Sequence, residues 1–184
     1  MFDADGFVAD CRQTAATGGA AGVLEIVSRA VSAPGEILGA LGEPRRAGVN
    51  VLCRSPELTV FNLIWGPQMC QLPHDHRMWA VIGIYTGRED NIFWRRPRND
   101  PNGRIEAAGA KALSEREAVP LGPDIIHSVI NPVSRLTGAI HVYGGDFFSA
   151  THSQWDPERL LEEPYDVKRL LSLFEESNRL HPAP

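Results

Sequence analysis

Cysteine is scarce in this chain of 184 residues, and the three that occur, Cys11, Cys53 and Cys70, show no CxxC spacing. An odd number of widely spaced cysteines argues against a disulfide framework and favours a reducing compartment. The N-terminal stretch carries acidic residues and lacks the positively charged segment and apolar run of a secretory signal. We therefore expect a cytoplasmic protein.

Long hydrophobic runs and positive net charge are also lacking. No apolar stretch approaches the ~18 residues that a membrane span requires. The chain has 18 Lys and Arg against 23 Asp and Glu, which gives a net charge of −5. This balance argues against a protein that binds nucleic acid through phosphate contacts. Neither a membrane nor nucleic acid is expected as a partner, and the sequence leaves the oligomeric state open.

What is present is the composition of an ordinary globular protein, with 43% hydrophobic and 22% charged residues. A chain of this length buries roughly 70% of its unfolded surface, so it can form a sizeable core without disulfides. Internal repeats, linkers and low-complexity segments are not evident in the sequence. We predict a single domain over residues 1–184.

The two ends of the chain have helical spacing. Apolar residues between Gly22 and Leu41 recur at three- and four-residue intervals, which predicts an amphipathic helix that Pro34 breaks into two. We assign residues 1–48 to this helical region. Residues 144–184 are expected to form a C-terminal extension, with helical spacing from Leu160 to Leu180 that is interrupted at Pro164.

The middle of the chain, residues 49–143, has a different pattern. Short β-branched and aromatic runs alternate there with turn signals rich in Gly, Pro, Asn and Asp. About eight short strands at regular spacing indicate a β-sandwich or barrel. The expected strands are Val49–Cys53, Thr59–Trp65, Trp79–Tyr85, Asn91–Arg95, Arg104–Ala107, Glu117–Val119, Ile125–Asn131 and Leu136–Val142.

Three histidines of this β region form a candidate metal site. His74 and His76 flank Asp75 just before an expected strand. Alternate residues of an extended segment point to the same side, so the two imidazoles can converge while Asp75 faces elsewhere. His127 lies in a second candidate segment, which begins at Pro120. We interpret the three histidines as ligands of one metal ion; the alternative is three unrelated polar residues on turns.

The two segments resemble the two motifs of the cupin superfamily, and the resemblance extends over about residues 54–143. It implies a mostly β fold: a double-stranded β-helix, or jelly-roll barrel, with the N-terminal helices and the C-terminal helix packed outside. The matching residues are Gly66, His74, His76 and Gly87 in the first motif, and Pro120, Gly122, His127 and Asn131 in the second.

One departure from the cupin motif carries chemical information. Many cupins place a glutamate ligand three or four residues after the histidine pair, where Trp79 and Ala80 stand here. Glu89 and Asp90, which follow Gly87, are expected to face water and lie too far along the chain to replace that ligand. Three neutral imidazoles would leave a divalent ion with open positions, which suits a bidentate substrate and dioxygen. Nitrogen ligands alone do not choose among Zn, Fe, Cu and Ni.

Within the cupins, two stretches resemble the thiol dioxygenases. The run from His74 to Gly83 is similar to the bacterial 3-mercaptopropionate dioxygenases, in which HDH leads into Trp-Gly-x-Ile-Gly. The run from Ala139 to Tyr143 is similar to the Ser-x-His-x-Tyr segment of the cysteine dioxygenases. The resemblance implies that His141 and Tyr143 form a catalytic relay beside an iron(II) ion. Two residues apart on one strand, they should face the same side.

Other positions match the family only in part. The arginine that holds the substrate carboxylate in cysteine dioxygenases can be placed on Arg54, for which a surface turn arginine is the alternative. The serine of the relay is replaced by Ala139. The cysteine that crosslinks to the tyrosine in animal-type enzymes is absent, with Ala80 and Val81 in that region. We therefore expect an uncrosslinked Tyr143 in a side branch whose substrate is unassigned.

The resemblance implies an iron(II) dioxygenase, with Zn or Ni possible in the purified protein. Its substrates would be O₂ and a small cysteine- or 3-mercaptopropionate-like thiol, which it oxidises to the sulfinate. One alternative is a three-histidine dioxygenase that cleaves a carbon–carbon bond of a diketone or flavonol, for which a hydrophobic pocket without Arg54 is expected. Another is a non-catalytic, metal-dependent module that binds a small molecule.

Overall fold

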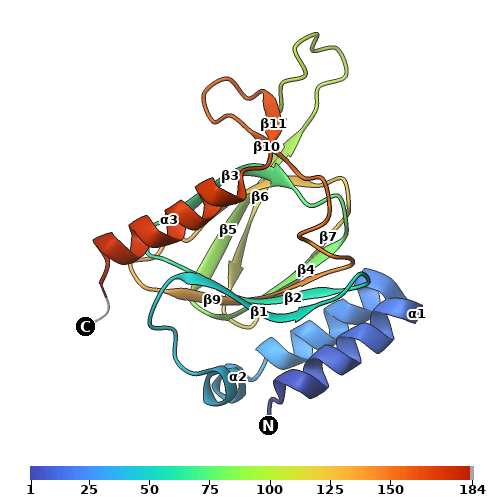
Figure 1. The fold of residues 1–184 in the computed structure, drawn as a ribbon, viewed down its shortest axis with the longest axis vertical. Helices are drawn as coiled ribbons and strands as arrows, with labels where there is room; N and C mark the ends of the chain where they lie inside the picture. The colour runs from blue at the N-terminus through green and yellow to red at the C-terminus, as the bar shows by residue number, and fades with distance from the viewer. Residues whose placement is uncertain (183–184) are drawn as a thin grey trace.

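A computed structural model describes residues 1–182. The chain forms two antiparallel sheets that face each other, with helices on the outside (Figure 1). One sheet has the strand order β1-β2-β9-β4-β7 and the other the order β11-β10-β3-β8-β5-β6. From β2 to β9 the chain passes repeatedly from one sheet to the other. This winding makes the fold a cupin-type double-stranded β-helix, as the sequence predicted.

The elements have the following bounds. The five-stranded sheet contains β1 Gly48–Arg54, β2 Thr59–Trp65, β4 Ala80–Thr86, β7 Ala118–Leu121 and β9 Thr137–Tyr143. The six-stranded sheet contains β3 Cys70–Asp75, β5 Arg88–Arg95, β6 Glu106–Ser114, β8 Ile126–Ile130, β10 Ser153–Trp155 and β11 Glu162–Pro164. The helices are α1 Ala4–Val31, α2 Pro34–Leu41 and α3 Val167–Leu180.

The N-terminal helix begins earlier than its apolar spacing suggested. Asp3 caps α1 by accepting a hydrogen bond from the backbone N–H of Gly6 at 2.9 Å. The helix bends at Gly19, whose φ of +54° glycine adopts at little cost. The predicted start at Gly22 therefore marks only its second half, whereas the predicted break at Pro34 separates α1 from α2.

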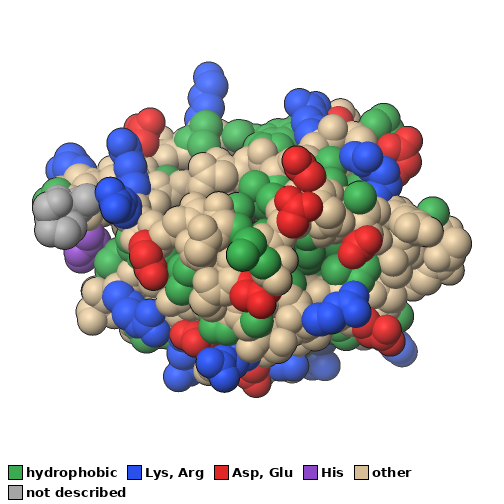
Figure 2. Space-filling view, turned by 90° about the horizontal axis from the view of Figure 1, so that it is seen from below, with side chains coloured by type: hydrophobic (Ala, Val, Ile, Leu, Met, Phe, Trp, Pro, Cys, Tyr) green, Lys and Arg blue, Asp and Glu red, His purple; other side chains and the backbone are tan. Residues whose placement is uncertain are grey.

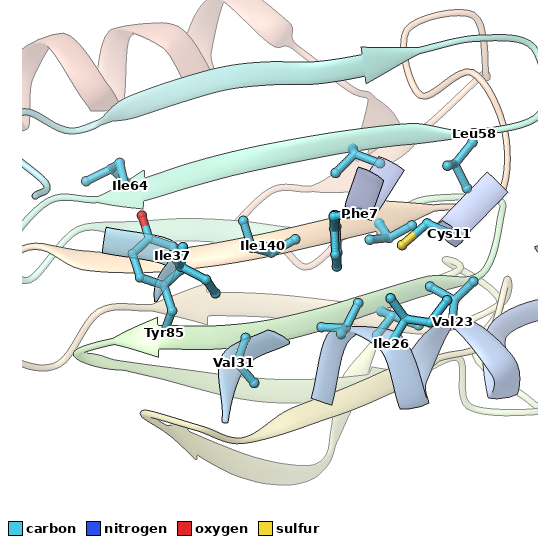
Figure 3. Packing of buried hydrophobic residues seen from close by; sticks show 14 residues of the cluster. Phe7, Cys11, Val23, Ile26, Val31, Ile37, Leu58, Ile64, Tyr85 and Ile140 are labelled. Carbon is cyan, nitrogen blue, oxygen red and sulfur yellow. The ribbon is translucent and has the colours of Figure 1, made fainter. Parts of the chain in front are cut away.

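Helices α1 and α2 cover the outer face of the five-stranded sheet (Figure 1). Buried side chains of the helices, among them Phe7, Val23 and Ile37, pack against strand residues such as Ile140 and Tyr85 (Figure 3). Burial of this apolar surface holds the helices on the sheet, at roughly 25 cal/mol per Å² removed from water. The inner face of the sheet remains available to line the barrel.

The predicted strands are largely present, with β2 observed at the predicted bounds. Strand β3 was not predicted, and it carries the first metal-ligand candidate. The predicted helical spacing before Pro164 is wrong, because β11 pairs there with β10. Leu160 has a φ of +58°, which no right-handed helix accommodates. These short strands extend the second sheet beyond residue 143.

The outer surface carries both signs of charge. Seen from the side on which α1 and α2 lie, acidic and basic side chains are interspersed among polar and apolar ones (Figure 2). Within residues 1–182, no helix combines the length and the apolar character that crossing a membrane demands.

Candidate metal centre

The three predicted ligands meet inside the barrel. His74 on β3 stands opposite His127 on β8 in the sheet register, and His76 follows directly after β3. The Nε2 atom of His76 lies 3.2 Å from Nε2 of His74 and 3.3 Å from Nε2 of His127. The three ligand atoms all lie within 4.8 Å of one another. All three side chains are buried.

Hydrogen bonds orient two of these imidazoles. Nδ1 of His74 lies 2.9 Å from the carbonyl oxygen of Leu72, and Nδ1 of His127 lies 2.6 Å from Oδ1 of Asn91. Because a carbonyl oxygen only accepts, Nδ1 must carry the proton in each ring. The Nε2 lone pairs are then free to bind a metal, the arrangement that partners of ligand histidines normally fix.

The protonation states also suit a metal. Burial lowers the pKa of His74 to about 4. Burial, reinforced by the neighbouring histidines, holds the pKa values of His76 and His127 well below their usual range. The imidazoles are therefore neutral at physiological pH, and neutral imidazole is the form that binds metal ions.

The spacing of the nitrogen atoms fits a single ion. Nitrogen atoms 3.2 and 3.3 Å apart are close enough for both to bind one ion through bonds of about 2.1 Å, and His74, His76 and His127 would hold it. Asp75 is turned away, because it accepts from the backbone N–H of Ser153 and pairs with Arg77 at 2.7 Å. Among the described residues, the ligand group consists of the three histidines alone. It can hold a divalent ion with positions open on the cavity side.

A cavity of about 480 Å³ adjoins the histidines. Its wall is mostly apolar, and Lys, Arg, Asp and Glu are absent from its described lining. The polar groups in the wall are the ligand histidines and a few uncharged or imidazole side chains. Those additional polar residues are Gln71, His141, Tyr143, Thr151, His152 and Tyr165.

The predicted relay residues lie on this wall. Nδ1 of His141 is 3.0 Å from the phenol oxygen of Tyr143, so the two side chains share a face of β9. The ring centre of Tyr143 is 5.0 Å from that of His76. Both relay residues are buried, and desolvation raises the pKa of Tyr143 well above its usual value. The phenol is therefore protonated at neutral pH.

The expectation that Glu89 faces water is wrong. Its side chain is fully buried and accepts hydrogen bonds from Nε1 of Trp65 at 2.7 Å and Nδ2 of Asn91 at 3.0 Å. Its Oε2 atom lies 3.4 Å from Nε2 of His141. Burial by itself raises the pKa of this carboxyl, but His141, Asn91 and Trp65 together hold the pKa below its usual value. Glu89 is therefore an ionised carboxylate next to His141, on the side of the ring away from Tyr143.

Arg54 does not line the cavity. Its guanidinium forms two hydrogen bonds of 3.0 Å with the carboxylate of Asp146 and lies 4.6 Å from the ring centre of Phe148. Phe148 does contribute to the wall. The structure thus brings together five of the six predicted site residues and leaves Arg54 outside, paired with a carboxylate of the chain itself.

Part of the cavity wall comes from the segment after the last predicted strand, to which the sequence assigned no role. Phe147 packs against both Tyr143 and His152, with ring centres 4.8 and 4.5 Å apart. Nε2 of His152 donates to the carbonyl oxygen of Phe147 at 2.6 Å. Tyr165 and α3 close the remaining side. The only signal in the sequence is the aromatic pair Phe147-Phe148 soon after β9.

Comparisons with known proteins give distant similarities. No protein family profile matches the chain. Similar solved structures include an RmlC-like cupin from Methanocaldococcus jannaschii, with a TM-score of 0.47 and 10% identity over 58% of this chain and 86% of the other. A DMSP lyase from Ruegeria pomeroyi has a TM-score of 0.46 and 15% identity over 61% and 53% of the two chains. An oxalate oxidase has a TM-score of 0.43 and 10% identity over 56% and 53%.

Proposed function

We propose that this protein is a metal-dependent dioxygenase that oxidises a thiol to its sulfinate with O₂. The observation that supports this most is that the three-histidine group and the hydrogen-bonded pair of His141 and Tyr143 line the same cavity. The residue pattern of this relay resembles that of the thiol dioxygenases. Iron(II) held by His74, His76 and His127 would supply open coordination positions for the substrate and dioxygen, and the redox chemistry to activate O₂.

The protein residues have separate tasks in this reaction. The apolar wall excludes water, which strengthens every polar interaction with a bound substrate. The phenol oxygen of Tyr143 can accept a hydrogen bond from a group bound beside His76, while the contact with His141 at 3.0 Å holds the phenol in place. Arg54 takes no part, because Asp146 already occupies its guanidinium.

The reaction balances without a further reductant. A thiol R–SH and O₂ give R–SO₂⁻ and a proton. The S–H and O–O bonds break and two S–O bonds form, so sulfur loses the four electrons that O₂ gains. The proton goes to solvent.

Oxygen uptake and product mass test this function. Iron(II)-reconstituted protein should consume one O₂ per thiol, and with ¹⁸O₂ both labelled atoms should appear in the sulfinate. The His76→Ala protein is the control, because it lacks one ligand and should neither retain iron nor consume O₂. If iron-loaded protein consumes no O₂ with any of a panel of carboxylated and uncharged thiols, the function is excluded.

The position of Arg54 favours a second candidate, a dioxygenase that cleaves a carbon–carbon bond. A diketone or flavonol needs no carboxylate clamp, and the wall of the cavity is mostly apolar. With a diketone, one oxygen atom enters each of the two fragments. The same ¹⁸O₂ experiment with 2,4-pentanedione distinguishes the candidates, because labelled fragments support C–C cleavage, whereas an intact diketone beside an oxidised thiol contradicts it.

A further inference from the structure

We infer that the substrate of this site is uncharged and has an apolar body that extends from the metal to the mouth of the cavity. This deepens the proposed function, on which it rests for the identity of the reaction. The described lining contains no lysine or arginine, so a carboxylate held away from the metal would be buried without a cation. Burial of an unpaired carboxylate is strongly unfavourable.

The mouth of the cavity is apolar, as its wall mostly is. Four apolar side chains line the cavity and are also 46–50% exposed: Val51, Phe148, Val167 and Leu171. Among the seven large hydrophobic side chains that are exposed in the described chain, these four surround one opening. Arg54, whose guanidinium lies over the ring of Phe148, is paired with Asp146. An apolar substrate chain would cover this apolar rim.

Two thiols that differ at the far end test this inference. Binding of 1-butanethiol and 3-mercaptopropionate to zinc-loaded protein can be measured by calorimetry, without turnover. The uncharged thiol should bind at least about tenfold more tightly, since both share the thiol and only one carries a carboxylate. Equal binding, or tighter binding of 3-mercaptopropionate, overturns the inference.

A pair of variants on α3 provides the control. Leu171→Lys places a cation at the rim and should shift the preference toward 3-mercaptopropionate by about threefold or more. Leu180→Lys adds the same charge to the same helix at a residue outside the cavity lining, and it should leave the preference unchanged. A failure of O₂ uptake alongside the expected preference would contradict the proposed dioxygenase and leave the substrate class standing.

A different observation supports a second proposal. The geometry points to Glu89 as a positioning residue that fixes both the relay and a metal ligand. Glu89 lies on β5 in one sheet, and His141 lies on β9 in the other. The relay serine of the resembled family is Ala139 here, which cannot hydrogen-bond. Nε2 of His141 makes no hydrogen bond among the described residues, and Glu89 Oε2, at 3.4 Å, is a carboxylate partner within ion-pair distance.

The hydrogen-bond capacity of Glu89 determines the direction of the network. An ionised carboxylate only accepts, and the Nε1 atom of Trp65 only donates. Oε2 of Glu89 accepts from Trp65 and faces Nε2 of His141 at 3.4 Å, so it favours the tautomer of His141 that carries its proton on Nε2. Nδ1 of His141 then accepts from the phenol O–H of Tyr143. Glu89 thereby sets the orientation of the phenol.

The other carboxylate oxygen leads to the metal group. Oε1 of Glu89 accepts from Nδ2 of Asn91, and Oδ1 of Asn91 accepts from Nδ1–H of His127. The amide of Asn91 is fixed by these two contacts, because a flipped amide would present a donor to His127. One buried carboxylate therefore orients a metal ligand through one oxygen and the relay through the other.

The histidine tautomer tests this proposal directly. In zinc-loaded, ¹⁵N-histidine-labelled protein, long-range ¹H–¹⁵N spectra should show His141 protonated on Nε2. Glu89→Gln keeps the shape but presents one oxygen and one NH₂ group to three N–H donors. His141 should then populate a second tautomer, and zinc affinity in a chelator competition should fall about three- to tenfold.

Asp90→Asn is the matched control. Asp90 is the next residue on β5 and pairs with Arg88 on the surface, so its substitution should change neither readout. Unchanged tautomer and zinc affinity in Glu89→Gln would overturn the proposal. If that variant does not fold, the wild-type spectrum still decides the matter, because an Nδ1-protonated His141 in the wild-type protein contradicts the proposal by itself.

Discussion

The phenol of Tyr143 lies near the three histidines but is not one of the predicted ligands. Its removal should therefore lower activity without lowering metal content. Tyr143→Phe removes only the oxygen that contacts His141, so iron content should stay nearly unchanged. Thiol oxidation should fall roughly ten- to a thousandfold, the range that a positioned hydrogen-bonding or proton-transfer group supplies. Metal analysis and oxygen uptake of the same preparation measure both quantities. Thiol oxidation at the wild-type rate would show that the relay does not contribute.

The pairing of Arg54 with Asp146 predicts a pH dependence of stability. Hydrogen bonds from Arg54 and Ser149 lower the pKa of Asp146 to about 2, below the value of about 3.9 for an unperturbed aspartate. A carboxyl whose pKa is depressed in the folded state contributes stability above its unfolded pKa and loses it as the pH falls toward the folded pKa. The wild-type protein should therefore exceed Asp146→Asn in unfolding free energy by a constant amount above about pH 5.

Urea unfolding at a series of pH values measures this difference. It should shrink between about pH 4 and pH 2, as Asp146 takes up its proton. Glu158→Gln, which removes another surface carboxylate that the described contacts do not pair with a cation, serves as the comparison. A wild-type advantage over Asp146→Asn that persists unchanged to pH 3 would contradict the role of the ion pair.

Two single residues show where the sequence could not predict the site. Alternation in an extended segment predicted that His74 and His76 converge, and the second motif added His127 to the group. A glutamate after a glycine turn reads as a surface residue, and only the facing strands reveal Trp65 and His141 around Glu89. Arg54 was assigned by resemblance, but the competing carboxylate, Asp146, lies 92 residues away in sequence.

At the scale of the elements, the contact between α1 and β4 leaves no room for a side chain at Gly83. A Cβ atom there would meet the methyl groups of Val27 and Val31. Gly83→Ala should therefore lower the unfolding free energy by about 1–3 kcal/mol, the usual cost of overpacking. Gly109→Ala on β6 is the control, because its Cβ would meet nothing within 4 Å. Equal stability of the two variants would show that α1 shifts to accommodate the added methyl group without loss of stability.

The elements themselves differ in how well the sequence reveals them. Strand β2 is mostly apolar and buried throughout, and it was predicted at its observed bounds. Strand β3 contains Pro73 and three polar residues, so it shows no alternation. Strands β10 and β11 have three residues each, too few for any period to emerge. Their pairing is a tertiary property and lies beyond what a local pattern can specify.

At the scale of the whole molecule, the ligands come from β3, the residue that follows it and β8, so a bound ion should stabilise the folded state. Free zinc at about 100 times its dissociation constant adds about 2.7 kcal/mol. For a chain of this size that corresponds to an increase of about 5–10 °C in the midpoint of thermal unfolding. Scanning calorimetry with and without zinc measures the shift. His76→Ala should lose it, and an equal shift in that variant would place the zinc elsewhere.

The residues that form the site and its wall follow a definite order along the chain. The three ligands occur by residue 127, whereas Phe147, His152, Tyr165 and α3 come after them. During synthesis, the ligands therefore leave the ribosome before the segment that closes the cavity over them. Until these later residues dock, the histidines are uncovered on that side. The nascent chain thus has an interval in which an ion can reach its ligands directly, and docking of the later segment ends that interval.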